Sequence, residues 1–273
     1  MFTPILYGVL LPLFSSALVV GAYVLATRNR SRRFSPFGIA ALGIGFIGAY
    51  LGLRGMPSFP PNEASQWLLL AIPVASLLTA VQRRLPNRAL ALGSIGLFFA
   101  TLFFAMLQPM FEYHWESFGL KALWLAGLTA FAVLFRWNWD HLEDHSRFGT
   151  LSVVGATSLA ALLFALSGSM FLAQLAGAFA AAAGPLVLLS FWNKDLPVFA
   201  GTRDLFSTVL LGLTTMAFFY AELQPVTAIL FLFALLLTGY TGLFPAHSLT
   251  KKIAVPGATA GAALAFAIIQ SGF

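Results

Sequence analysis

The chain has 273 residues, of which 59% are hydrophobic and only 9% are charged, and its formal net charge is +6. Soluble domains carry about a quarter charged residues, so this composition excludes a water-soluble globular protein. Apolar runs continue from Pro4 to Phe273 and leave no polar stretch long enough for a separate soluble domain. The sequence therefore predicts a single transmembrane domain over residues 1–273.

The apolar runs have the length and pattern of membrane-spanning helices. A helix that crosses a bilayer needs roughly 20 mostly apolar residues, whereas strands of a membrane barrel alternate polar and apolar residues. Runs such as AGAFAAAAGPLVLLSFW do not alternate. We therefore expect an all-α polytopic membrane protein with about ten transmembrane helices. In chain order the predicted spans are 4–26, 36–53, 66–81, 89–109, 119–136, 150–167, 170–192, 205–221, 226–244 and 254–271.

Basic residues fall almost entirely in every second predicted loop. Of the 15 lysines and arginines, only Arg54 and Lys121 belong to the other set of loops. An excess of Lys and Arg in short loops marks the cytoplasmic side of a membrane. The pattern predicts that both termini face outward (N-out, C-out), in a bacterial cytoplasmic (inner) membrane. It assigns the net charge, Arg136 and Arg203 included, to orientation and contact with lipid headgroups, and no nucleic-acid partner is expected.

Two stretches of the chain are closely similar, GLFFATLFFAMLQP at 96–109 and GLTTMAFFYAELQP at 212–225. Phe-Gly pairs and prolines recur elsewhere at a similar spacing, and a fixed offset is the mark of internal duplication. We therefore predict a tandem parallel four-helix internal repeat. Repeat A covers 1–110, repeat B covers 111–225, and a partial third repeat covers 226–273. An even number of helices gives the copies one orientation, so Pro109 and Pro225 should lie at the same face of the membrane.

Small residues four apart recur in several predicted spans. Such stripes let helix backbones approach closely in lipid, where there is no hydrophobic force between helices. They include Gly45 and Gly52 in the second span, and Gly257 and Gly261 in the tenth. We expect these faces to pack against other helices of the same chain.

The deepest polar side chains of the predicted spans are uncharged. Gln174 lies in the seventh span, and Thr214 and Thr215 lie in the eighth. A buried amide or hydroxyl is costly unless it is hydrogen-bonded. These residues are candidates for lining a substrate path, and hydrogen bonds between helices are the alternative interpretation.

A second group of candidates lies at the ends of the repeated stretches. Gln108 and Gln224 precede Pro109 and Pro225, and Glu222 stands beside one of the two amides. The two amides and the carboxylate could line an outward opening. The alternative is that the prolines only punctuate helices at the outer surface.

The segment WNWDHLEDHSRF, residues 137–148, offers most of the candidate metal ligands. On a helical extension His141 and His145 share a face, Asp144 is close to them, and His247 belongs to a loop on the same side. Imidazole and carboxylate groups together suit a divalent metal such as zinc or iron. The alternative is a solvated polar loop in which Trp137 and Trp139 lie at the lipid headgroups.

These features support three hypotheses of function. The first is a transport-like carrier for a small neutral or amphipathic solute, motivated by the duplication and the glycine-rich faces. The second is a non-catalytic transmembrane subunit of a larger membrane complex, whose partners would be other membrane proteins besides the lipid bilayer. The third is a cytoplasmic-side metal-dependent lipid enzyme. An ion-coupled pump is disfavoured because all nine acids fall in loops or at helix ends. We expect a carrier, no enzymatic activity and no cofactor, with a divalent metal as the one alternative.

Overall fold

A computed structural model describes residues 5–27, 37–82, 85, 87–115, 117–140, 142, 147–192, 202–240 and 249–271. Within these residues every regular element is a helix and none is a strand. The elements are a π-helical turn η1 (Leu6–Leu10) and the helices α2 (Leu11–Thr27), α3 (Phe37–Arg54), α4 (Ala64–Gln82), α5 (Arg88–Tyr113), α6 (Phe118–Trp139), α7 (Arg147–Leu166), α8 (Met170–Trp192), α9 (Thr202–Tyr220), α10 (Pro225–Tyr240) and α11 (Leu249–Ser271).

Each predicted span coincides with a helix, and η1 with α2 forms the first of them. Local chemistry explains several boundaries. The side chain of Asn87 accepts a hydrogen bond of 2.8 Å from the backbone N–H of Ala89 and so caps the start of α5. Gly168, with a φ of +87°, follows α7 in a left-handed conformation that glycine adopts readily. Pro225 is the first residue of α10, where its missing N–H costs nothing.

The other proline of the repeated stretches behaves differently. Pro109 lies inside α5, which continues to Tyr113. The prediction that this proline ends a helix is therefore wrong, whereas Pro225 does begin one.

Among the residues that the structure describes, six helical segments are long and apolar enough to cross a membrane, which is consistent with an integral membrane protein. They are Leu6–Leu25, Ala64–Gln82, Arg88–Tyr113, Phe118–Trp139, Phe148–Leu166 and Met170–Trp192. Many of their large apolar side chains point away from the protein; Leu18, Leu97, Leu123 and Leu162 are among the exposed ones. In lipid such side chains need no protein partner. The crossing number of ten stays a prediction.

Helix α9 is more polar than its neighbours because protein encloses it. Every residue from Thr202 to Ala217 is buried, and α9 contacts α4, α6, α3, α7, α8, α10 and α5. A helix that does not meet lipid can carry charged groups in its first turn, as α9 does with Arg203 and Asp204. Helix α9 is therefore the centre of the bundle.

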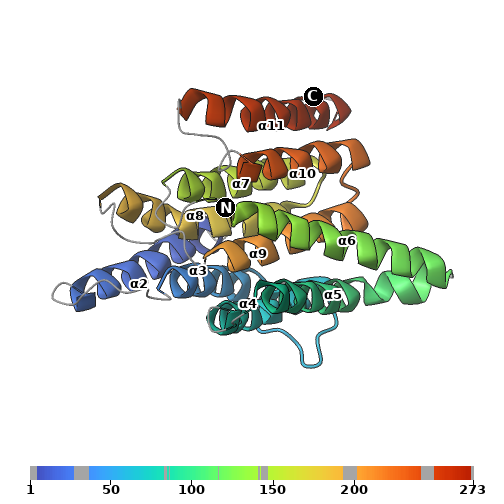
Figure 1. Cartoon of the computed structure of the whole chain (residues 1–273), viewed down its shortest axis with the longest axis horizontal. Helices are drawn as coiled ribbons and strands as arrows, with labels where there is room; N and C mark the ends of the chain where they lie inside the picture. Colours follow the sequence, from blue (N-terminus) through green and yellow to red (C-terminus); the bar gives the residue numbers. More distant parts are fainter. Residues whose placement is uncertain are drawn as a thin grey trace.

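The helices run side by side along one axis, with α11 at one edge and α4 and α5 near the other (Figure 1). Contacts between helix ends show that α5 and α9 run in the same direction and that α4 runs in the opposite one. At one end, Tyr220 Oη donates a hydrogen bond of 2.7 Å to the carbonyl of Met106. At the other, Thr79 Oγ1 donates one of 2.6 Å to Asp204 Oδ2. We name the two ends of the bundle the Pro109 end and the Asp204 end.

Small residues allow α2, α3 and α8 to approach closely. Ser16 Oγ donates a hydrogen bond of 2.6 Å to the carbonyl of Ala182, and a Cβ placed on Gly45 would lie 2.6 Å from Ala182 Cβ. The predicted packing role of the second span is confirmed at Gly45. It is wrong for Gly257 and Gly261, which face open space in a groove between α7, α10 and α11.

Candidate functional site

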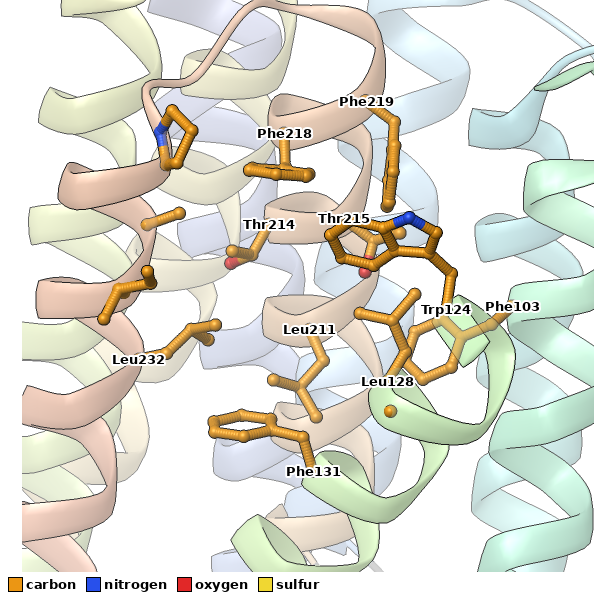
Figure 2. A pocket seen from close by; sticks show the side chains of 14 residues that line it. Phe103, Trp124, Leu128, Phe131, Leu211, Thr214, Thr215, Phe218, Phe219 and Leu232 are labelled. Atoms are coloured by element: carbon orange, nitrogen blue, oxygen red, sulfur yellow. The ribbon is translucent and has the colours of Figure 1, made fainter. Parts of the chain in front are cut away.

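An apolar cavity of about 380 Å³ lies between α6, α9 and α10, with one contribution from α5. Figure 2 shows its lining, which combines aromatic rings with aliphatic side chains. The lining residues are Phe103, Trp124, Gly127, Leu128, Phe131, Leu211, Thr214, Thr215, Phe218, Phe219, Pro225, Ala228, Ile229 and Leu232. Since α9 contributes residues from its middle and last turns, the cavity lies between the centre of the bundle and the Pro109 end.

Aromatic rings cluster beside the cavity toward the Pro109 end. The rings of Trp124 and Phe219 meet edge to face with their centroids 5.2 Å apart, and Phe218 packs perpendicular to Phe219 at 4.9 Å. Trp115 extends this cluster, with its ring stacked 6.1 Å from that of Trp124. Edge-to-face aromatic pairs are favourable beyond the area they bury, so this aromatic cluster stabilises the wall of the cavity toward that end.

Two threonine hydroxyls supply most of the polar character of the lining. Thr214 Oγ1 donates a hydrogen bond of 2.8 Å to the carbonyl of Leu210 within α9. The Thr215 hydroxyl has no hydrogen-bond partner within the described part of the chain. In Figure 2 the Thr214 oxygen points toward α10 and the Thr215 oxygen points toward α6. No lining residue carries a charge.

A buried cluster of charges joins α4, α6 and α9 at the Asp204 end. The Arg136 guanidinium pairs with the carboxylates of both Asp204 and Asp140. Arg203 Nη1 lies 3.0 Å from Asp140 Oδ1, and Thr79 donates to Asp204. Arg136 is 8% exposed and Asp204 is 5% exposed. Two cations and two anions therefore balance one another, as buried charges require.

This cluster corrects the sequence analysis, which assigned Arg136 and Arg203 to lipid headgroups. The charges lie at helix termini, and the side chains turn into the bundle because an acidic partner is close by. The spacing of Arg136 and Asp140 by four residues was a usable signal, since such pairs are neighbours on one helix face. The ion pair between Arg136 and Asp204 joins residues far apart in sequence, and no sequence pattern predicted it.

The end of α6 also holds α10. Asn138 Nδ2 donates a hydrogen bond of 2.6 Å to the carbonyl of Leu236, and Trp139 Nε1 donates one of 3.0 Å to that of Leu235. A Cβ on Gly239 would lie 2.8 Å from Asn138, so only glycine permits this approach. Trp139 is fully buried, and the prediction that it lies at the headgroups is wrong because its N–H finds a carbonyl inside the bundle.

The structure brings only two of the predicted substrate-lining residues to this cavity, Thr214 and Thr215. Gln174 is half-buried in the first turns of α8 and is absent from the lining. Gln108 is exposed and donates a hydrogen bond of 2.9 Å to Glu112 Oε1 in a cleft between α4 and α5. Gln224 and Glu222 are exposed in a different hollow, beside α7 and α11. The two amides therefore do not share one opening.

The predicted metal ligands His141, Asp144, His145 and His247 lie outside the described residues. Among the residues that the structure does describe, no group of three or more His, Asp or Glu side chains could hold a metal ion.

Comparison with known proteins identifies no similar protein. No protein-family model matches the chain, and neither a curated protein nor a solved structure matches it significantly.

Proposed function

We propose that this chain is a transport-like carrier that binds a small, neutral, largely apolar solute in the cavity between α6, α9 and α10. The observation that carries the proposal is the lining, which combines five aromatic rings with two hydroxyls and has no charged group. A charged ligand would lose its hydration in such a site without gaining a partner. An apolar ligand has no such hydration to lose, so entering the cavity carries no comparable cost in free energy.

The dimensions of the cavity fit a small molecule. Ligand sites are typically apolar hollows of roughly 300–1,000 Å³ with a few placed polar groups. The cavity has a volume of about 380 Å³, at the lower end of that range. A compact ligand with one to three rings is therefore the expected occupant.

Different contacts hold the walls of the cavity together toward the two ends of the bundle, an arrangement that suits a carrier. The aromatic cluster joins α6 and α9 toward the Pro109 end, and the charge cluster with the Asn138 and Trp139 contacts joins α6, α9 and α10 at the Asp204 end. Charges that separate into water regain hydration, which offsets the loss of their pairing. We propose that the Asp204 end opens by separating this cluster. The lining has no ionisable group to couple an ion, so the movement is driven by the solute gradient alone.

The orientation follows from the basic residues. We propose that the Asp204 end faces the cytoplasm of a bacterial cell and that both termini face outward. The support is the Lys and Arg excess in the loops of that end.

The test is saturable binding of N-phenyl-1-naphthylamine, a neutral aromatic probe that fluoresces in apolar sites, to the purified chain in lipid nanodiscs. The variant Leu211→Trp enlarges a buried side chain of the lining. The matched control Leu97→Trp enlarges an exposed side chain outside the lining. We expect the wild-type chain and L97W to bind alike and L211W to bind at least tenfold more weakly.

Equal binding by L211W and the wild-type chain would place the probe in the bilayer and overturn the proposal. A second variant, Gly127→Leu, guards against misfolding of L211W, because a Cβ on Gly127 meets no atom within 4 Å. Stable partner proteins that copurify with the native chain, together with no saturable binding, would favour the hypothesis of a membrane-complex subunit instead.

A further inference from the structure

The hydroxyl of Thr215 belongs to the cavity lining and has no hydrogen-bond partner among the residues that the structure describes. Thr215 is 5% exposed, and within the described part of the chain its oxygen makes no hydrogen bond. A hydroxyl that faces an apolar cavity without a hydrogen-bond partner is unfavourable, because it has lost its contact with water. A ligand oxygen that pairs with this hydroxyl would remove that cost.

The neighbouring hydroxyl is not available in the same way. Thr214 Oγ1 already donates to the carbonyl of Leu210 at 2.8 Å, which is the usual arrangement for threonine inside a helix. Figure 2 shows the two oxygens on different sides of α9. A single ligand group on the α6 side would therefore meet Thr215 and not Thr214.

The remaining lining determines the body of the ligand. The rings of Trp124 and Phe131 from α6 and of Phe219 from α9 belong to the lining (Figure 2). Aromatic rings pack favourably against one another in edge-to-face and offset arrangements. No acid or base in the lining can compensate a ligand charge. An uncharged aromatic body satisfies both conditions.

From these observations we infer that the solute is a neutral aromatic molecule with one hydroxyl or carbonyl group, and that Thr215 is the residue that selects for this group. The inference rests on the proposed function, since it names the class of solute for the same cavity. Thr215 donates to a carbonyl oxygen or exchanges a hydrogen bond with a ligand hydroxyl. A hydrocarbon of the same shape leaves the threonine unpaired and binds less well.

The experiment measures displacement of N-phenyl-1-naphthylamine from nanodisc-embedded protein by 2-naphthol and by naphthalene, which differ by one hydroxyl. Thr215→Val keeps the shape of the side chain and removes its hydroxyl. A hydrogen bond between neutral groups contributes about 0.5–1.5 kcal/mol. We therefore expect T215V to weaken 2-naphthol binding about 3- to 10-fold and to change naphthalene binding less than twofold.

Two further variants separate recognition from general disturbance of the site. Thr214→Val removes the adjacent hydroxyl, which is already paired, and should leave the ratio of the two affinities unchanged. Thr215→Ser keeps a hydroxyl at the position and should restore the preference for 2-naphthol.

The outcomes distinguish this inference from the proposal on which it rests. If the probe binds with saturation but T215V and the wild-type chain show the same preference for 2-naphthol, the role of Thr215 is wrong and the cavity proposal stands. If neither ligand displaces the probe, or if no saturable binding is found, the proposed function fails as well.

Discussion

One close contact between three helices depends on a single glycine whose neighbours are fixed to the backbone. At Gly45 of α3 an added Cβ would lie 2.6 Å from Ala182 Cβ and 3.2 Å from the carbonyl oxygen of Pro12. Neither neighbour can turn aside, because one is a methyl group fixed to the backbone and the other is backbone itself. Ser16 binds the carbonyl of the same Ala182. Helices α2, α3 and α8 therefore converge on this residue.

We predict that Gly45→Ala lowers the free energy of unfolding by about 1–3 kcal/mol, the usual cost of overpacking. The control Gly93→Ala lies on α5, where an added Cβ meets no atom within 4 Å. It should be neutral or stabilise the protein by about 0.5–1 kcal/mol, since alanine is the better helix former. Unfolding in detergent micelles measures both variants, and equal stability of G45A and G93A would contradict the packing.

The burial of an individual polar side chain was predictable from sequence only where its position in the middle of a helix decides it. Thr214 and Thr215 lie in the middle of an apolar run, so any helical bundle must bury them, and both line the cavity. Gln174 was equally conspicuous, but its depth depends on where α8 begins, and it lies in the first turns. Gln108 and Gln224 share a motif, yet their surroundings differ because Pro109 continues α5 and Pro225 starts α10.

The end of α6 is the element that organises the Asp204 end of the bundle. Within its last two turns it provides Arg136 to α9, and Asn138 and Trp139 to α10. These contacts hold the walls of the cavity together on one side. The other side relies on ring packing between α6 and α9. Different kinds of force thus hold the walls of the cavity together toward the two ends of the bundle.

We predict that Arg136→Gln and Asp204→Asn each lower the free energy of unfolding by about 3 kcal/mol, because each leaves a buried charge without its main partner. The double variant should be less destabilised than the sum of the two, with a coupling energy above about 1 kcal/mol. A double-mutant cycle in detergent micelles measures this coupling. Additive effects would mean that the two side chains do not form a pair in the folded protein.

Secondary structure was the most predictable level, because long apolar runs in lipid must satisfy their backbone hydrogen bonds internally and so form helices. The prolines and glycines between the runs then located the ends within a few residues. Charge pairing was not predictable, since Arg136 and Asp204 meet only after α6 and α9 pack together. A residue near a helix end can face either headgroups or protein, and composition does not decide between them.

At the scale of the whole molecule, the ends of the helices agree with one part of the predicted repeat. The hydrogen bond from Tyr220 to the carbonyl of Met106 puts Pro109 and Pro225 at the same end of the bundle. In a bundle whose helices alternate in direction, any two helices an even number of positions apart would meet this condition. The tandem repeat therefore remains a prediction. Its boundaries at residues 110 and 225 remain predictions too.

The neighbour relations do not recur at intervals of four helices. Helix α2 packs along α3, whereas the corresponding pair α6 and α7 is not in extensive contact. Pairs of packed helices correspond better at an interval of five helices. The pair α2 and α3 corresponds to the pair α7 and α8, and the pair α5 and α6 corresponds to the pair α10 and α11. The similar sequences recur at an interval of four helices, whereas the similar packing recurs at an interval of five. The one therefore does not explain the other.

The proposed orientation is open to a direct test because the chain has no cysteine. Ser117 is exposed near the start of α6, at the Pro109 end, and Arg88 is exposed at the start of α5, at the opposite end. We predict that a membrane-impermeant maleimide added to intact bacterial cells that express the chain labels S117C and leaves R88C unlabelled until the membrane is broken. The reverse pattern would mean that the Asp204 end faces outward.

The most direct test of the central claim is to locate a bound solute. A neutral naphthalene derivative that carries a photoreactive diazirine is irradiated with the protein in nanodiscs, and the labelled residues are mapped by mass spectrometry. The account predicts labels on α6, α9 and α10 at lining residues such as Leu128, Leu211 and Leu232, with labelling suppressed by excess unlabelled 2-naphthol. Labels confined to lipid-exposed residues such as Leu97 and Leu162, and unaffected by the competitor, would contradict it.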